Sequence, residues 1–248
     1  MQIEYAKVSA LGDRQDNQDR AAVVVSDDAA LMLVFDGMGG HSDGARAAQT
    51  GLQVVQDLFM AATQPIFDPQ GFLYMALSHA HDEVVRIGQD VAVDFRPRAT
   101  CAICLVQEGG AFWAHVGDSR IYQVRDGAVL VRSRDHSHVE VLIQEGAITE
   151  EEAQDHPMRN FVECCIGGDA AVPDMSITPQ KSLQYGDVLL ACSDGLWSGL
   201  TDDDMAKIGA PGDSNLVENL KMLSLKALGV NAPYSDNTTG TALRWLGI

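Results

Sequence analysis

The chain has 248 residues, of which 46% are hydrophobic and 21% charged, an ordinary composition for a globular protein. Its net charge of −18 argues against a nucleic-acid partner, because phosphate backbones are bound by clusters of basic residues. No apolar run is long enough to cross a bilayer, the first residues do not resemble a signal peptide, and 5 cysteines do not predict a disulfide framework. We therefore expect a cytoplasmic protein with no membrane partner.

Apolar periodicity divides the first hundred residues into short strands followed by amphipathic helices. The expected strands are 2–8, 20–25 and 30–36. A helix is expected from Asp43 to Phe59, and a second one is expected to end near Gly88 after a break containing proline. On that second helix, His79 and His81 are expected to face solvent.

The rest of the chain predicts hairpins interrupted by helices. The first hairpin is expected to turn at Gly109-Gly110 and the second at Asp126-Gly127. The remaining expected strands are 99–106, 111–117, 119–124, 128–132, 174–178, 187–192 and 239–246. Helices are expected between His138 and Asp155, after Thr201, and from 216 to 227. This order predicts one α+β domain, residues 1–248, with antiparallel sheets and helices packed outside them.

Two of the predicted buried strands end in an acidic residue followed by glycine. Asp36-Gly37 follows the run from Leu31 to Phe35, and Asp194-Gly195 follows the run from Val188 to Cys192. A carboxylate at the end of a buried strand is costly unless a cation or several donors stabilise it. Glycine allows the backbone to approach closely, so its carbonyl can also act as a ligand. A single Asp-Gly pair is most simply a turn, but two such strand ends indicate a site for hard cations.

Three more aspartates stand at predicted strand ends or turns: Asp19, Asp118 and Asp236. Oxygen ligands of this kind suit Mg²⁺ or Mn²⁺, and no cysteine–histidine set has the spacing of a zinc site. Two such ions can share a water, lower its pKa and hold both ends of a displacement at phosphorus. Arg14 could supply a planar fork for a substrate phosphate.

These segments together resemble the metal-dependent protein phosphatases of the PP2C (PPM) type, especially their compact bacterial members. The matching segments are Arg14 to Asp19, Asp36-Gly37-Met38-Gly39-Gly40-His41, Gly117-Asp118-Ser119-Arg120, Ser193-Asp194-Gly195 and Ser235-Asp236-Asn237-Thr238. The resemblance covers essentially the whole chain. It implies an αββα sandwich of two antiparallel sheets flanked by helices. It also implies hydrolysis of phosphoserine and phosphothreonine by a water that a dinuclear Mn²⁺ or Mg²⁺ site activates, with no phosphoenzyme.

The resemblance also implies roles for individual residues. Asp36 would bridge two core ions, the Gly37 carbonyl would ligate one of them, and Asp194 and Asp236 would supply the remaining core carboxylates. The other implied roles are a contact to the metal cluster for Asp19, a third and weaker ion held by Asp118 with Asp194, phosphate binding by Arg14, and a flap beside the active site at about 138–168. The implied partners are phosphorylated proteins, including a serine/threonine kinase or its targets, and a monomer is expected.

Three departures from the family pattern bear on the chemistry. Gln18 stands where many members carry glutamate, so one metal contact made through water is expected to be weaker. Met38 stands where eukaryotic members carry a histidine that protonates the leaving group. His41 would either take that role or cap the following helix. Cys164-Cys165 in the flap favours a small apolar strand over redox control, because no neighbour stabilises a thiolate.

Two rival functions remain. A pseudophosphatase would keep the fold and bind phosphoproteins without turnover, and Gln18 is the only residue in its favour. A two-metal nuclease or phosphodiesterase shares the metal chemistry, but the negative net charge and the absence of a basic groove argue against it.

Overall fold

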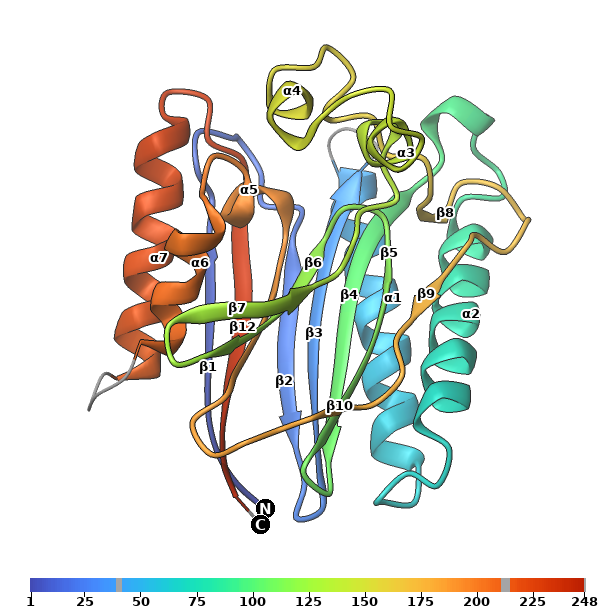
Figure 1. The fold of residues 1–248 in the computed structure, drawn as a ribbon. Helices are drawn as coiled ribbons and strands as arrows, with labels where there is room; N and C mark the ends of the chain where they lie inside the picture. Colours follow the sequence, from blue (N-terminus) through green and yellow to red (C-terminus); the bar gives the residue numbers. More distant parts are fainter. Residues whose placement is uncertain (39–41, 211–214, 248) are drawn as a thin grey trace.

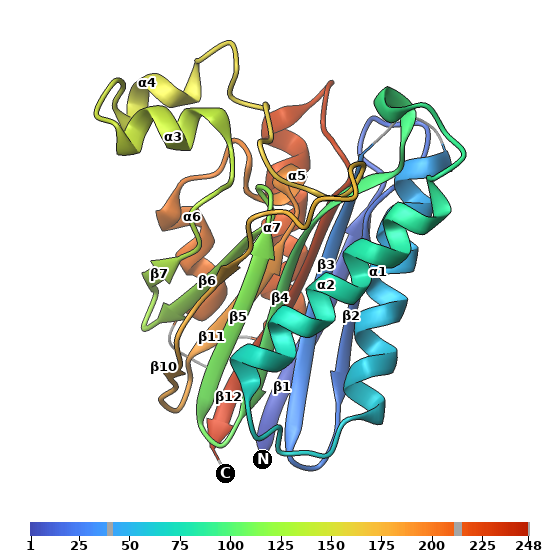
Figure 2. The same cartoon turned by 90° about the vertical axis from the view of Figure 1, so that its right-hand side faces the viewer.

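Two antiparallel sheets pack face to face and carry helices on their outer faces, as Figures 1 and 2 show from two sides. The computed structural model describes residues 1–38, 42–210 and 215–247. The five-stranded sheet has the order β1 (Gln2–Ala10), β12 (Thr238–Gly247), β11 (Val188–Cys192), β6 (Arg120–Arg125) and β7 (Ala128–Arg132). The seven-stranded sheet has the order β10 (Lys181–Ser182), β5 (Gly110–Val116), β4 (Arg98–Gln107), β3 (Ala29–Met38) and β2 (Arg20–Val25), with β8 (Ile166–Gly167) paired to β4 and β9 (Ser176–Ile177) paired to β5. The predicted α+β sandwich is confirmed.

The helices cover the two sheets unequally. The outer face of the seven-stranded sheet carries the long helices α1 (Ser42–Ala61) and α2 (Pro69–Ile87). The outer face of the five-stranded sheet carries α7 (Leu216–Asn231), with the short helices α5 (Asp194–Trp197) and α6 (Asp202–Ala206) beside it. The remaining helices are η1 (Val93–Phe95), α3 (His138–Gln144), α4 (Glu150–Gln154) and η2 (Lys207–Gly209). None of the helices described is long and apolar enough to cross a membrane.

The position of β3 explains why its sequence is a continuous apolar run rather than an alternating one. Leu31, Leu33 and Phe35 pack beneath α1 and α2, whereas Met32 and Val34 pack between the two sheets. Both faces of the strand are therefore buried, and a strand buried on both faces has no position for an exposed polar residue. The strand carries its first carboxylate, Asp36, only near its end.

Strand β4 is also buried on both faces, and this shows whether its two cysteines, Cys101 and Cys104, could bind a metal ion together. Cys101 packs beneath the helices and Cys104 packs between the sheets. The two thiols point to opposite faces, so they cannot share a metal ion. Both are core residues.

Two local expectations are wrong. The turn between β4 and β5 lies at Glu108-Gly109, where both residues have positive φ, so it is displaced by one residue from Gly109-Gly110. His81 is buried rather than solvated, because β8 packs against α2 and the amide of Gly167 donates a hydrogen bond to its Nδ1 at 3.1 Å. The turn at Asp126-Gly127 is as predicted, with positive φ at both residues.

Candidate metal centre

A cleft of about 510 Å³ opens at the end of the sandwich where β3 and β11 terminate. This is the upper end in Figure 1, beneath α3 and α4. The cleft is lined by Asp13, Arg14, Gln15, Asp16, Gln18, Asp36, Gly37, Met38, Asp118, Asn160, Val162, Asp194, Asp236 and Asn237. Of the predicted site residues, Arg14, Asp36, Gly37, Asp118, Asp194 and Asp236 therefore share one cleft. Asp19 is buried and is not among the lining residues, but it accepts a hydrogen bond from Ser193, which precedes Asp194.

Each aspartate reaches the cleft from the end of a different strand. Asp36 lies two residues before the end of β3, and Asp118 lies in the connection from β5 to β6. Asp194 is the first residue of α5, two residues after β11 ends. Asp236 lies two residues before β12 begins. Antiparallel strands brought together by the two-sheet packing thus deliver carboxylates that are up to 200 residues apart in the chain, from Asp36 to Asp236.

Both Asp-Gly pairs need glycine because the backbone passes another segment closely. A Cβ on Gly37 would lie 2.1 Å from the carbonyl oxygen of Gly44 in α1. A Cβ on Gly195 would lie 2.1 Å from the carbonyl oxygen of Asn237. Any side chain at either position would clash with main-chain atoms, so the close approach predicted from sequence is confirmed.

The carboxylates at this end of the sandwich are electrostatically unbalanced. Burial raises the pKa of Asp19 to about 7 and that of Asp194 to about 6, and the neighbouring Asp236 raises the pKa of Asp194 further. Burial and the charge of Asp19 raise the pKa of Asp36 well above its usual value. Burial and Asp194 do the same for Asp118. In this arrangement the ionised forms oppose one another, so a cation between them would stabilise all of them.

Arg14 is the cation that lines the cleft. Its Nη2 donates to Oδ2 of Asp236 at 2.5 Å, and this contact raises the pKa of Arg14. The Arg14 side chain remains 59% exposed, so it is accessible from the cleft or solvent. Arg14 pairs with Asp236, and among the described residues no lysine or arginine forms an ion pair with Asp36, Asp118 or Asp194.

A divalent ion fits the donors that are present. Oδ2 of Asp19 accepts a hydrogen bond from Ser193 Oγ at 2.8 Å, but its buried Oδ1 has no hydrogen-bond partner among the described residues. Within residues 1–38, 42–210 and 215–247, no three His, Cys, Asp or Glu side chains are gathered closely enough to cage an ion by themselves. Carboxylates spread around a cleft instead suit ions whose coordination is completed by a backbone carbonyl and water, as Mg²⁺ and Mn²⁺ prefer.

Asn237 holds the cleft wall together, a role that the sequence did not reveal. Its Nδ2 donates to the carbonyl oxygens of Leu11 and Asp16, at 2.8 and 3.0 Å, and its Oδ1 accepts from the amide of Gln18 at 2.8 Å. The loop that carries Arg14 is thereby fixed to the residue after Asp236. The position of Asn237 beside Asp236 was the available signal, but its partners are more than 200 residues away.

The predicted flap begins with α3 and α4 and contributes Asn160 and Val162 to the cleft. Cys164 and Cys165 are half-buried and precede β8, so the short strand begins after them. Burial raises the pKa of both thiols, so neither is an activated nucleophile. His41 lies outside the residues that the structure describes.

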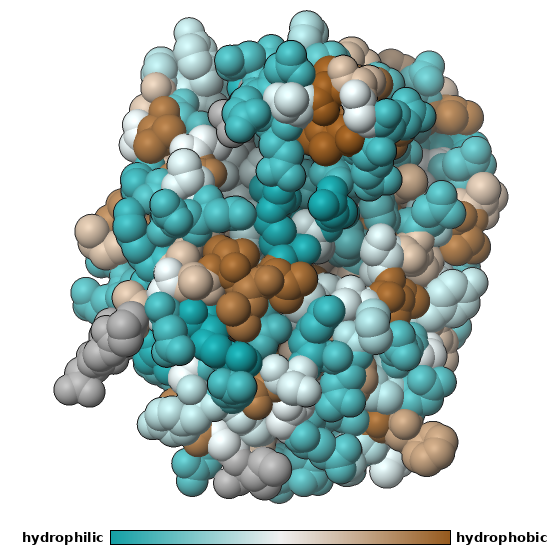
Figure 3. Space-filling model, viewed as in Figure 1, coloured by the Kyte–Doolittle hydropathy of each residue, from teal (hydrophilic) through white to brown (hydrophobic). Residues whose placement is uncertain are grey.

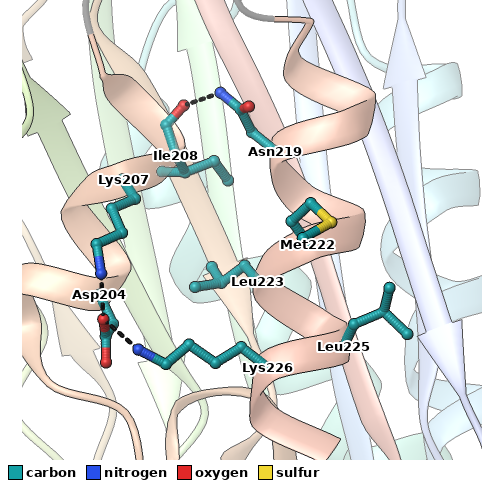
Figure 4. A pocket seen from close by; sticks show the side chains of 8 residues that line it. All are labelled: Asp204, Lys207, Ile208, Asn219, Met222, Leu223, Leu225 and Lys226. Atoms are coloured by element: carbon teal, nitrogen blue, oxygen red, sulfur yellow. Dashed lines mark hydrogen bonds and ion pairs between the residues drawn. The ribbon is translucent and has the colours of Figure 1, made fainter.

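A second hollow, of about 470 Å³, lies between η2 and α7 (Figure 4). Its floor is apolar and includes Ile208 and Leu223. Asp204 at its edge accepts from Lys207 Nζ at 2.6 Å and lies 2.5 Å from Lys226 Nζ, and these contacts hold the pKa of Asp204 below its usual value. Because its acid is already matched by two ammonium groups, this hollow has no need of a metal ion.

The family model described as "Protein phosphatase 2C" matches residues 8–224. The chain belongs to the protein phosphatase 2C family. Protein phosphatase PhpP of Streptococcus pneumoniae is 31% identical to this chain over 245 residues. The match covers 96% of this chain and 95% of PhpP. The serine/threonine protein phosphatase PstP of Mycobacterium tuberculosis is 32% identical over 249 residues, and the match spans 44% of the length of PstP. A solved structure of the PstP catalytic domain in complex with two manganese ions superposes with a TM-score of 0.81 at 26% identity, covering 99% of each chain.

Proposed function

We propose that this phosphatase 2C family member hydrolyses phosphoserine and phosphothreonine in proteins with the help of Mn²⁺ or Mg²⁺. The observation that carries the proposal is the set of buried, mutually repelling carboxylates around the cleft, with Arg14 as the cation in its lining. Such a set favours divalent cations strongly. The same cleft holds a guanidinium that can bind a phosphate by two parallel hydrogen bonds.

Each cleft residue receives a role in this proposal. Asp36 would be the carboxylate shared by two core ions, the Gly37 carbonyl would be a ligand, and Asp194 and Asp236 would complete the core set. Asp19 would contact the cluster through its buried Oδ1, which has no hydrogen-bond partner among the described residues. Asp118 and Asp194 would together hold a third, weaker ion. The ions, when bound, supply the positive charge that lowers the pKa of a water and neutralises the phosphoryl oxygens.

Arg14 and the surrounding wall hold the substrate. The Arg14 guanidinium is anchored at one edge by Asp236, so its remaining N–H groups are aimed rather than free to rotate. Asn237 keeps the Arg14 loop against the carboxylates, which fixes the distance between phosphate binding and the nucleophile. The proton for the leaving group comes from His41 or from solvent water.

The organisation of the chain is proposed along the same lines. Residues 1–248 form one catalytic domain, and residues 138–168 form its flap, which contributes Asn160 and Val162 to the substrate cleft. The protein acts as a cytoplasmic monomer on phosphoproteins that include a serine/threonine kinase or its targets, without nucleic-acid or membrane partners.

Gln18 is the residue that bears on the choice between this function and that of a pseudophosphatase. Gln18 lines the cleft, and its backbone N–H donates a hydrogen bond to Asn237 Oδ1. The glutamine is therefore part of the cleft wall. The carboxylates Asp36, Asp194 and Asp236 are all present beside it. A neutral amide at this position can still hydrogen-bond water, so turnover is retained.

The test compares substrates of three kinds in one assay with Mn²⁺. A phosphothreonine peptide is expected to release phosphate, a DNA phosphodiester is expected to be left intact, and Gln18→Glu is expected to change the Mn²⁺ concentration for half-maximal rate without creating activity anew. Phosphopeptide binding without phosphate release, restored by Gln18→Glu, would establish the pseudophosphatase. Faster cleavage of the diester would establish the nuclease.

A further inference from the structure

Trp197 links two carboxylates of the cleft that come from different strands. The short helix α5 begins at Asp194 and ends at Trp197, so one turn of helix carries both residues. The indole Nε1 of Trp197 donates a hydrogen bond of 3.0 Å to the backbone carbonyl oxygen of Asp118. The distance between the Asp118 and Asp194 backbones is therefore set by a rigid ring rather than by the loops alone.

Arg120 holds that ring in place. Its guanidinium carbon lies 3.4 Å from the centroid of the Trp197 ring, a close cation–π contact. One edge of the guanidinium is engaged by Asp135, since Nε and Nη2 donate to its two carboxylate oxygens at 2.8 and 2.7 Å, and Nη1 donates to the Tyr122 hydroxyl at 3.3 Å. The Arg120 and Asp135 side chains are only 16% and 7% exposed, so neither is free to leave the pair without stranding a buried charge.

Asp135 connects this stack to the base of the flap. The next residue, His136, donates its amide to the carbonyl oxygen of Gly117 at 2.8 Å and accepts from the amide of Glu163 at 2.8 Å. Gly117 precedes Asp118, and Glu163 lies in the flap, three residues before β8. The stack of Trp197, Arg120 and Asp135 is thus attached both to the Asp118 loop and to the neck of the flap.

We propose that Trp197 and Arg120 are positioning residues that fix Asp118 relative to Asp194 and so set the affinity of the cleft for its weakest divalent cation. The inference rests on the proposed function for the existence of that cation site. Neither side chain is proposed to touch the ion or the substrate. Because the hydrogen bond and the stacking act on Asp118 and not on Asp236, their loss weakens one cation step and leaves the others.

The test is a Mn²⁺ titration of the whole chain, in which free Mn²⁺ is followed by its electron paramagnetic resonance signal. Asp118→Asn identifies the step that depends on Asp118. Trp197→Phe keeps an aromatic face for Arg120 but removes the N–H, and it is expected to weaken that step about fivefold, the size of one lost hydrogen bond. Asp135→Asn is expected to weaken the same step by a smaller factor, because it loosens Arg120 without emptying the space.

Trp245→Phe is the matched control, since Trp245 lies between the sheets and is not part of the cleft. It is expected to leave every Mn²⁺ step unchanged. The proposal is overturned if Trp197→Phe binds Mn²⁺ as the unchanged protein does, or if all steps weaken together in parallel with a fall in melting temperature. Absence of Mn²⁺ binding by the unchanged protein would instead remove the cation site, and the proposed function with it.

Discussion

The two hollows of this molecule hold acidic residues in opposite electrostatic states. In the hollow between η2 and α7, Asp204 is contacted by Lys207 and Lys226, which lower its pKa. In the cleft above β3 and β11, burial and neighbouring acids raise the pKa values of Asp36 and Asp194. The acid of the first hollow contacts two lysines, whereas in the described part of the cleft only Asp236 forms an ion pair, with Arg14.

That difference separates acids paired within the chain from the acids that we propose bind cations. Asp187, which is fully buried, also has an internal partner, because Arg125 donates to both of its carboxylate oxygens at 2.6 and 2.7 Å. Acids that stabilise the fold are thus matched by lysine or arginine within the chain. The cleft acids hold an excess of negative charge that destabilises the metal-free fold and becomes favourable when divalent cations bind.

The largest expected effect comes from Asp36→Asn. Removing the charge of the proposed bridging carboxylate should lower turnover of a phosphothreonine peptide about 10³-fold, because electrostatic stabilisation of the phosphoryl group depends on the ions it holds. The same change should raise the melting temperature of the metal-free protein, since it removes a buried charge. Calorimetry in EDTA checks the second effect. Near-normal turnover would mean that Asp36 is not a metal ligand.

A smaller effect is expected from Arg14→Ala. Loss of a charge-assisted fork should raise KM for a phosphopeptide by about tenfold or more. Mn²⁺ affinity, measured by titration calorimetry, should be unchanged or slightly higher, because Asp236 loses a competing cation. An equal loss of Mn²⁺ binding and of substrate binding would show that Arg14 serves to hold the cleft in shape.

The pH dependence of the melting temperature should distinguish the two kinds of acid. The pKa values of Asp19, about 7, and Asp194, about 6, lie above the unfolded value for aspartate, so the folded protein binds more protons than the unfolded chain across this range. Metal-free protein should therefore lose stability as pH rises from 5 to 8. Saturating Mn²⁺ should abolish the loss, and a metal-free melting temperature that rises over this range would contradict the account.

The smallest effect on catalysis is expected from Asp204→Asn. This substitution should lower the melting temperature near neutral pH, because two lysines lose the charge they contact. Turnover and Mn²⁺ affinity should stay at the level of the unchanged protein. A change in Mn²⁺ affinity would mean that the hollow at α7 and the cleft are not independent.

The gathering of carboxylates at one end of the fold was predictable because its signals are local. An apolar run such as Leu31 to Phe35 identifies a buried strand, and the Asp-Gly pair that follows it identifies a carboxylate beside a close backbone approach. The hydrogen bond from Trp197 to Asp118 joins residues 79 positions apart, and no sequence pattern announces it. His81 was misplaced for the same reason, since Gly167, 86 residues later, covers it.

The predicted position of the turn between β4 and β5 was wrong for a different reason. Gly109-Gly110 satisfies the preference of tight hairpins for glycine, but the strand pairing extends to Gly110 and leaves Glu108 to adopt a φ of 49°. Cross-strand register, fixed by burial of both faces, outweighed the local preference of the turn.

The most direct test of the account is phosphate release from a phosphothreonine peptide by the unchanged protein, Asp236→Asn and Asp204→Asn, each with Mn²⁺ and with EDTA. The account predicts turnover that requires Mn²⁺, that collapses in Asp236→Asn, and that persists in Asp204→Asn. Turnover that survives EDTA, or that falls equally in both variants, would contradict the claim that the unbalanced carboxylates are the catalytic cation site.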